Sequence, residues 1–288
     1  MTAKEIIAYM ESLRNEEQRR VLMGFFKTGP GEYGEGDEFL GLKVPQTREI
    51  VKAVAKDIAL EEIPTLLLSK WHEVRLCGLL ILVAKFSALA ERPKVERERL
   101  TKRTAARTPL KCTEKTNDKD APLEYTEEAI RGRDEILSLY LKYAERANNW
   151  DLVDLSVPKI LGHWLLLPTK IPPLPTSPRG GDVKRQVLDE LAQSDNLWKQ
   201  RMSMVCTWKT SQMGDPSWCL RYAEIHLHHP HDLMHKAVGW MLREMGKRCS
   251  MDLLREFLRQ HVYEMPRTML RYAIEKMSEQ ERQYWLKL

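Results

Sequence analysis

The sequence predicts an all-α protein, on three observations. Apolar residues recur at spacings of three and four along most of the 288 residues, which is the period of an amphipathic helix. Alternation with a period of two, which marks a half-buried strand, is almost absent. Capping residues stand before several of the periodic stretches. Many short helices with short connections favour a solenoid of antiparallel helix pairs.

Seven segments carry the helical spacing, with charged residues between the apolar ones. In chain order they are residues 46–59, 74–86, 128–147, 184–193, 195–208, 232–247 and 251–261. Asp182, Ser194 with Asp195, and Asp232 stand where they would cap three of these helices. No strict sequence period links the segments, so we expect degenerate repeats of the HEAT-like kind.

We expect a single domain over residues 1–288 with two inserted loops. Residues 93–125 are polar and contain three prolines, and residues 168–182 contain five. Within residues 97–111 six basic side chains face one acid, Glu98. That run is either a solvated loop or an arm with salt-sensitive affinity for phosphates.

Composition excludes a disordered or membrane-embedded protein. The chain is 43% hydrophobic and 30% charged, as ordinary soluble proteins are. Its longest apolar run, residues 76–84, is far shorter than the roughly 20 residues that cross a bilayer, and the charged N-terminus shows no signal peptide. Five cysteines without a CxxC pair give neither a disulfide framework nor a zinc knuckle. The net charge of +5 permits an anionic partner without requiring one.

An acidic residue interrupts an apolar helical face in NNWDLVDLSVPKILGHW. Trp150, Val153, Asp154 and Val157 share that face, and Pro158 either bends the helix or starts a second one. A carboxylate there is costly unless it is paired or faces a cleft. Asp154 is therefore either bonded to a neighbouring helix terminus or held beside an aromatic wall at low dielectric. Asp151 points elsewhere, and we interpret it as compensation of the helix dipole.

A basic residue interrupts a second apolar stripe, in SDNLWKQRMSMVCTW. Leu197, Arg201, Met204 and Trp208 fall at offsets of 0, 4, 7 and 11. A guanidinium cannot lose its proton and needs an anion. The anion is either an internal carboxylate, with Asp154 itself as a candidate, or a phosphate.

Trp240 lies off the apolar face of the segment 232–247, beside Lys236, Arg243 and Lys247. Such a tryptophan is either half-buried under lysine stems or exposed to stack on a base or sugar beside phosphates.

Five histidines crowd into ten residues, at positions 226, 228, 229, 231 and 235. His231 and His235 have the i, i+4 spacing of metal ligands, but no HExxH pattern is present and Pro230 separates the first three from the helix. We expect a wet loop leading into a capped helix. A metal hydrolase built on this cluster is a lesser alternative, which chelators would inhibit.

Four segments together resemble the DNA alkylation repair family, the AlkD-type, HEAT-like DNA glycosylases. They are GEYGEGDEFLGLKVPQTREIVK (31–52), NNWDLVDLSVPKILG (148–162), SDNLWKQR (194–201) and HKAVGWMLREMGKR (235–248). The resemblance runs from about residue 1 to residue 285, apart from the two inserts. It is specific, because the WDxVD core, the QR step and the KAxGWxLRE helix follow in the expected order.

The resemblance implies a solenoid whose concave basic face binds double-stranded DNA carrying alkylated bases. The implied activity is removal of cationic bases, chiefly 7-methylguanine and 3-methyladenine, by cleavage of the N-glycosidic bond. No metal or cofactor is implied, and the base need not leave the duplex. The expected protein is a monomer away from membranes, cytoplasmic and associated with the nucleoid, or nuclear in a eukaryotic source.

The family's motif residues carry over onto Trp150, Asp154, Arg201 and Trp240. The resemblance implies that Asp154 stabilises the cationic sugar and positions water, that the tryptophans hold the deoxyribose, and that Arg201 grips a phosphate. Tyr33 matches loosely an aromatic residue that contacts DNA in relatives.

The expected chemistry agrees with the single carboxylate, Asp154, that the helical pattern of the sequence indicates. A base alkylated at a ring nitrogen is already cationic and leaves without a general acid, so the carboxylate pair of ordinary glycosidases is not needed. A carboxylate about 4 Å from the developing cation, at an effective dielectric near 20, contributes about 4 kcal/mol, or roughly 10³-fold in rate. The alternative from another class is a non-catalytic HEAT-repeat module that binds DNA structures or a protein partner.

Overall fold

The computed structural model describes residues 1–90, 125–172 and 182–288. Across these residues the chain is helical, and no strand forms; Glu38 and Trp71 make one isolated bridge. The predicted all-α class is confirmed. The assignment of residues 1–288 to one domain with two inserts stays a prediction. Most of both inserts, and the whole basic run at 97–111, lies outside the described residues.

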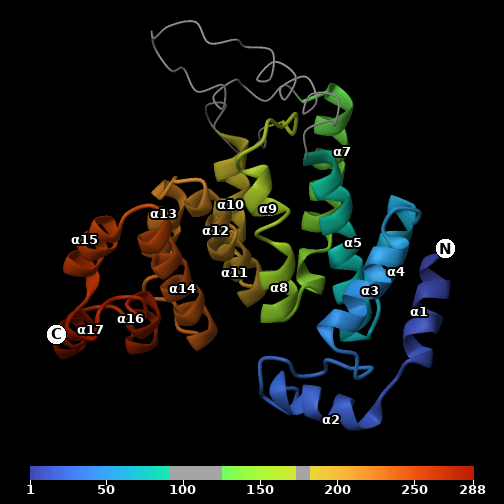
Figure 1. The fold of residues 1–288 in the computed structure, drawn as a ribbon, viewed down its shortest axis with the longest axis horizontal. Coiled ribbons are helices and arrows are strands. Elements are labelled where there is room, and N and C mark those ends of the chain that lie inside the picture. Colours follow the sequence, from blue (N-terminus) through green and yellow to red (C-terminus); the bar gives the residue numbers. More distant parts are fainter. Residues whose placement is uncertain (91–124, 173–181) are drawn as a thin grey trace, which may run out of the picture.

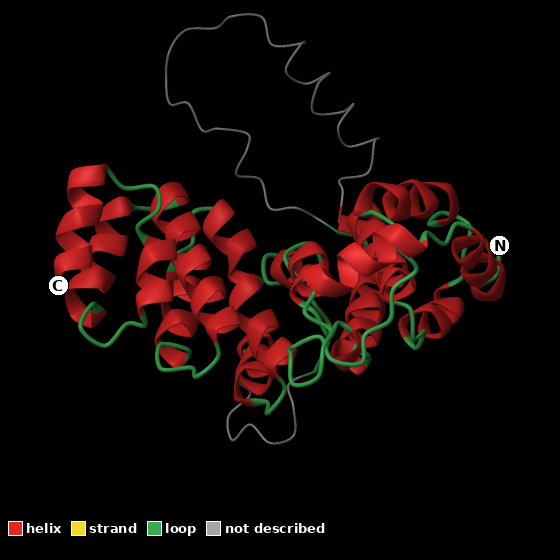
Figure 2. Cartoon of the chain, turned by 90° about the horizontal axis from the view of Figure 1, so that it is seen from below, coloured by secondary structure: helices red, strands yellow, loops and turns green. Residues whose placement is uncertain are grey.

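The helices follow one another along a curved array whose two ends carry the two termini (Figures 1 and 2). The first part contains α1 (Ala3–Ser12), α2 (Glu16–Phe25), α3 (Val44–Val54), η1 (Leu60–Glu62), α4 (Ile63–Leu67) and α5 (His72–Ala90). The middle contains α7 (Glu127–Lys142), η2 (Ala144–Arg146), α8 (Trp150–Ser156) and α9 (Leu161–Trp164). The last part contains α10 (Val183–Gln193), α11 (Leu197–Val205), α12 (Thr207–Gln212), α13 (Ser217–Ile225), α14 (Asp232–Arg248), α15 (Met251–His261), α16 (Arg267–Ala273) and α17 (Glu279–Lys287).

One hydrophobic core extends through the whole array, from Ala3 on α1 to Trp285 on α17. Each helix packs mainly on its neighbours: α5 contacts α3, α4, α7 and α8, and α14 contacts α11, α12, α13, α15 and α16. This is the packing of a solenoid, in which every helix pair buries its apolar face on the next pair.

The seven predicted helical segments are present, with different bounds. The segment 195–208 is two helices, because α11 ends at Val205 and α12 begins at Thr207. The prediction also missed α1, α2, α4, α13, α16 and α17. These helices are short or, like α2, carry few buried residues, so their periodic signal is weak.

Two of the predicted caps are wrong by one or two residues. Asp182 caps α10 as predicted, with its side chain accepting from the Lys184 amide. Asn196 caps α11 in place of Ser194 and Asp195, and His231 caps α14 in place of Asp232. In each case the residue directly before the first helical turn is the one whose side chain reaches the free amides.

Candidate functional site

Helix α8 carries the candidate residues Trp150 and Asp154 and lies between α5 and α11. The Asn149 side chain fixes its start, since Oδ1 accepts from the Trp150 amide at 2.9 Å. The helix ends at Ser156, just before Pro158, which has no amide hydrogen to continue it. Of the two readings of Pro158, the second helix is the one present, although α9 begins at Leu161 and not at Pro158 itself.

Asp154 and Arg201 form a two-pronged ion pair between α8 and α11. Nε of Arg201 donates to Oδ1 of Asp154 at 2.9 Å, and Nη2 donates to Oδ2 at 2.8 Å. Nη1 donates to the carbonyl of Leu233, beside the start of α14, at 2.6 Å. Of the anions that the sequence left open for Arg201, the internal carboxylate of Asp154 is therefore present. One guanidinium joins three helices at this point.

The pair lies at the edge of solvent. The Arg201 side chain is 6% exposed and the Asp154 side chain 15%. Burial raises the pKa of Asp154 above its ordinary value, and the Arg201 guanidinium acts against that rise. The remaining exposure of Asp154 is toward a hollow in the protein surface.

This hollow has a volume of about 580 Å³ and lies between α2, α8, α11, α14 and α16. It brings together all but one of the residues predicted from the sequence. Its walls are Phe25, Lys27, Tyr33, Trp150, Asp154, Arg201, Leu233, Lys236, Trp240, Arg243 and Tyr272. Lys247 is exposed on the last turn of α14 and does not line the hollow. Among these described walls, Asp154 is the only acidic side chain.

A glycine on α14 positions Trp240 at the hollow. A Cβ on Gly239 would lie 2.4 Å from the carbonyl oxygen of Met269 and 2.6 Å from Cβ of Tyr272. Only glycine therefore allows α14 to lie this close to α16. Trp240, the next residue, is half-buried and lines the same hollow as Trp150.

Lys236 and Arg243 have acidic partners that do not line the hollow. Lys236 lies 2.7 Å from Asp232, which raises the pKa of Lys236. Arg243 bonds to Glu275 and lies 3.5 Å from Glu244. Such partly exposed pairs contribute about 0–1 kcal/mol each, so exchanging one for a phosphate costs little.

Asp151, three residues before Asp154, faces α5, whereas Asp154 faces α11. Oδ2 of Asp151 lies 2.9 Å from Nε2 of His72 on α5, and Nδ1 of His72 lies 2.7 Å from Oδ2 of Asp37. Arg75 bonds to the other oxygen of Asp37. The two carboxylates overcome the cost of burial and raise the pKa of His72 to about 9, so the imidazole is protonated at neutral pH.

The interpretation of Asp151 as a helix-dipole residue was incomplete. It stands in the first turn of α8, but it is buried and bonded to His72. This network of Asp37, His72, Arg75 and Asp151 was not predicted from the sequence. The available signal was HEVR at the start of an otherwise apolar helix, since buried charged side chains require partners.

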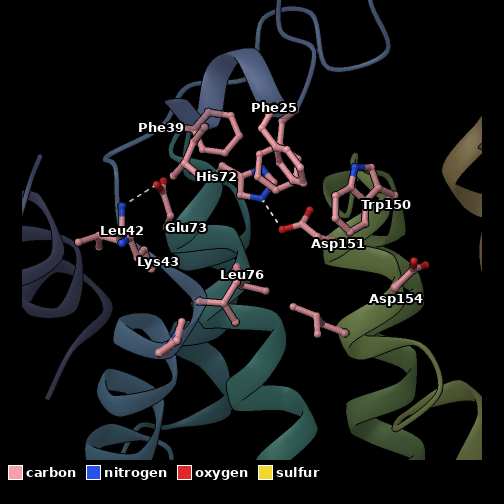
Figure 3. Close-up of a pocket in the computed structure, with 15 residues that line it drawn as sticks. Phe25, Phe39, Leu42, Lys43, His72, Glu73, Leu76, Trp150, Asp151 and Asp154 are labelled. Carbon is pink, nitrogen blue, oxygen red and sulfur yellow. Dashed lines mark hydrogen bonds and ion pairs between the residues drawn. The ribbon is translucent and has the colours of Figure 1, made fainter. Parts of the chain in front are cut away.

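A second, largely apolar pocket adjoins the hollow (Figure 3). Its volume is about 430 Å³, and Phe25, Trp150 and Asp154 line both spaces. Asp151 and His72 lie in its wall.

The clustered histidines bond to protein groups. His226 lies 2.8 Å from the hydroxyl of Ser203, His229 lies 2.8 Å from Oε1 of Gln200, and His231 caps α14. Within the part of the chain that the structure describes, no three His, Cys, Asp or Glu side chains are grouped to hold a metal ion. The same residues include no helix with the length and apolar character to span a bilayer.

Comparisons with known proteins give a family and a common fold. The family model described as "DNA alkylation repair enzyme" matches residues 6–109 and 115–277. A solved structure of a "Predicted DNA alkylation repair enzyme from Enterococcus faecalis" superimposes with a TM-score of 0.59. The alignment covers 92% of this chain and 97% of that one, at 12% sequence identity, and therefore shows a common fold. A search of curated proteins gives no significant match.

Proposed function

The chain belongs to the DNA alkylation repair enzyme family, and from that premise we propose that it is a glycosylase that excises cationic alkylated bases from duplex DNA. The substrates are lesions such as 7-methylguanine and 3-methyladenine, and the bond cleaved is the N-glycosidic bond. The observation that carries the proposal is one carboxylate, Asp154, in a hollow that is also lined by two tryptophans and by basic residues.

Asp154 is suited to stabilise an oxocarbenium-like sugar. The two bonds from Arg201 fix the carboxylate, so it needs no reorganisation when positive charge develops. The guanidinium also weakens the field of Asp154 at longer range. Stabilisation of about 4 kcal/mol, roughly 10³-fold in rate, is therefore limited to a sugar about 4 Å from the carboxylate.

The walls of the hollow select for a base that is already cationic. Trp150 and Trp240 offer aromatic faces to a cationic sugar, each worth about 0.5–2 kcal/mol. Among the described walls no second carboxylate and no histidine stands ready to protonate a departing base. A neutral lesion would leave slowly from such a site, so we propose a narrow range of cationic substrates.

Arg201, Lys236, Arg243, Lys247 and Tyr33 are the proposed DNA contacts. Arg201 has five N–H groups, and the bonds to Asp154 and Leu233 use three of them. The other two suffice for one phosphate oxygen. Arg201 would then hold the DNA backbone and the catalytic carboxylate at once.

One observation favours the alternative, a non-catalytic module that binds DNA structures or a protein partner. Both oxygens of Asp154 already accept from Arg201, so the pair is neutral as a whole. A protein of this kind would bind DNA without cleaving it.

A release assay separates the two functions. Methylated duplex DNA is incubated with the full chain in EDTA, and free 7-methylguanine is measured over time alongside binding to the same DNA. We expect release that requires no metal. Binding without release, from protein shown to be folded, would replace the glycosylase with the binding module.

A further inference from the structure

One lysine on the wall of the hollow has a backbone conformation that glycine normally occupies. Lys27 has a φ of 55°, and in the described part of the chain the other four residues with positive φ are all glycines. In this left-handed region a Cβ atom crowds the backbone, so residues other than glycine, asparagine and aspartate are rare there. A lysine at this position is therefore less favourable for folding than a glycine would be.

Lys27 ends helix α2 at the position where glycine is most common. The amide of Thr28 donates to the carbonyl of Met23 at 3.2 Å, and the amide of Lys27 donates to the carbonyl of Gly24 at 3.4 Å. With Phe26 as the cap, these two bonds form a Schellman motif, in which the left-handed residue after the cap is usually glycine. The presence of lysine here indicates that its side chain has a use other than ending the helix.

The surroundings of Lys27 fix it at the hollow beside Trp150. Phe26, the residue before it, is buried and stacks on Trp150 with ring centres 5.4 Å apart. The carbonyl of Lys27 accepts from the amide of Gly34 at 3.0 Å, and a Cβ on Gly34 would lie 2.4 Å from the carbonyl oxygen of Phe26. This packing holds the turn in its left-handed conformation and places the lysine in the same walls as Trp150 and Asp154.

The ammonium of Lys27 is the most weakly paired cation in the described walls of the hollow. Its Nζ lies 4.0 Å from Oε1 of Glu32, at the limit of an ion pair, and the side chain is 57% exposed. The other basic walls, Arg201, Lys236 and Arg243, each have a carboxylate within hydrogen-bonding distance. A free ammonium would repel a positive charge that develops on a sugar in the same hollow. Lys27 therefore suits such a site only when an anion of the substrate lies beside it.

We propose that Lys27 binds a backbone phosphate of the DNA from the end of α2, while Arg201, Lys236 and Arg243 hold the backbone from α11 and α14. The inference rests on the proposed function and adds a contact that the sequence did not predict. An ammonium on a flexible stem binds phosphate as a compact point charge. Contacts from the first and last parts of the array restrict movement of the strand, which keeps its sugar near Asp154.

Two lysines give a matched pair of variants that each remove one charge. Lys27→Gln removes the ammonium at the hollow. Lys70→Gln removes an ammonium of similar exposure, 61%, that lies 3.2 Å from Glu38 and does not line the hollow. Lys27→Arg keeps the charge, and Lys27→Gly removes it together with the unfavourable backbone contact.

Thermal melting tests whether the backbone disfavours lysine. Lys27→Gln and Lys27→Gly both lack the ammonium and its interaction with the dipole of α2, but only glycine fits the left-handed conformation freely. We expect Lys27→Gly to melt at the higher temperature. The opposite order would show that the fold itself favours a side chain here and would contradict the inference.

The main test is binding to a duplex with a central tetrahydrofuran abasic site, which has no base to release. Fluorescence anisotropy at several salt concentrations gives the slope of the logarithm of the binding constant against the logarithm of salt concentration. We expect Lys27→Gln and Lys27→Gly to bind more weakly than wild type and to reduce this slope by about 1. Lys27→Arg and Lys70→Gln should match wild type. A wild-type slope in Lys27→Gln would overturn the proposal, because a role in folding alone changes melting and leaves the slope unchanged.

Uncharged methylphosphonate linkages, placed one at a time on either side of the abasic site, locate the phosphate. At one linkage wild type should lose affinity while Lys27→Gln loses no more, because its contact is already absent. Independent losses at every linkage would contradict a direct contact between Lys27 and a phosphate.

Release of free 7-methylguanine from methylated duplex DNA tests the glycosylase separately. The expected binding results, together with no release by folded wild type, would support the lysine contact and contradict the glycosylase. Release by wild type, together with unchanged binding by Lys27→Gln, would contradict the lysine contact and leave the glycosylase intact.

Discussion

Two carboxylates three residues apart on α8 have opposite surroundings. Asp151 is buried against α5 in a network with His72, Asp37 and Arg75. Asp154 is held from α11 by Arg201 and keeps 15% of its side chain exposed to the hollow. Both are paired, so the presence of a paired buried carboxylate does not identify a reactive site. The difference lies in access to solvent. Asp151 only links α8 to α5, whereas Asp154 links α8 to α11 and is also accessible from the hollow.

The largest expected effect on stability comes from removing the cation beside Asp154. Arg201→Ala leaves a mostly buried carboxylate unpaired and should lower the free energy of unfolding by about 3–5 kcal/mol. Asp154→Asn breaks the same pair and should lower it by more than about 2 kcal/mol. Urea unfolding measures both. As a control, Arg221→Ala removes the more exposed Asp189–Arg221 pair and should cost about 1 kcal/mol or less; equal losses for Arg201 and Arg221 would contradict the comparison.

The bonds of His72 to Asp151 and Asp37 should make the free energy of unfolding depend on pH. The folded pKa of His72 is about 9 against an ordinary 6.5, so its contribution is complete below pH 6.5 and is lost as pH rises through 9. The shift corresponds to about 3 kcal/mol. Unfolding curves between pH 6 and pH 9.5 should show this loss in wild type and not in His72→Asn. A pH profile that stays the same in the variant would assign the loss to another group.

The position of Trp240 should depend on the glycine before it. Gly239→Ala forces a Cβ against the Met269 carbonyl, which moves α14 away from α16 and should cost about 1–3 kcal/mol. Gly24 on α2 has nothing within 4 Å of the corresponding position, so Gly24→Ala should be neutral or stabilising. Thermal melts of the two variants compare the sites. A neutral Gly239→Ala would mean that the helix contact is looser than described.

The smallest expected effects are on DNA binding by the basic walls. Lys236→Ala and Arg243→Ala should each weaken binding uniformly across sequences and reduce the salt dependence of log K by about 1. Each residue would have to give up an exposed acidic partner to bind phosphate, so neither loss should be large. Fluorescence anisotropy at several salt concentrations measures the slope. Unchanged slopes in both variants would place the DNA elsewhere.

Much of the fold and the centre of the candidate site could be predicted from the sequence. Helical period alone predicted the all-α class, and residues that break that period, Asp154 and Arg201, turned out to face each other. The sequence could not decide between a carboxylate and a phosphate for Arg201, because the partner lies 47 residues away and depends on how α8 and α11 pack.

Helical periodicity could not predict the network of Asp37, His72, Arg75 and Asp151. Asp37 comes from a Gly-rich acidic loop and His72 from the first turn of an apolar helix, so neither breaks a periodic pattern clearly. Only the packing of α5 on α8 shows that they and Asp151 belong together. Short helices such as α16 and α17 were not predicted for a related reason, because one or two turns give too few residues to establish a period.

The most direct test compares two aspartates in single-turnover release of 7-methylguanine from methylated duplex DNA. Asp154→Asn removes the carboxylate in the hollow, and Asp189→Asn removes a carboxylate that is likewise bonded to an arginine, Arg221, but does not line the hollow. With both variants kept well below their melting temperatures, we expect Asp154→Asn to lose roughly 10³-fold in rate and Asp189→Asn to match wild type. Release by folded Asp154→Asn at the wild-type rate would contradict the central claim that this carboxylate stabilises the cationic sugar as the base departs.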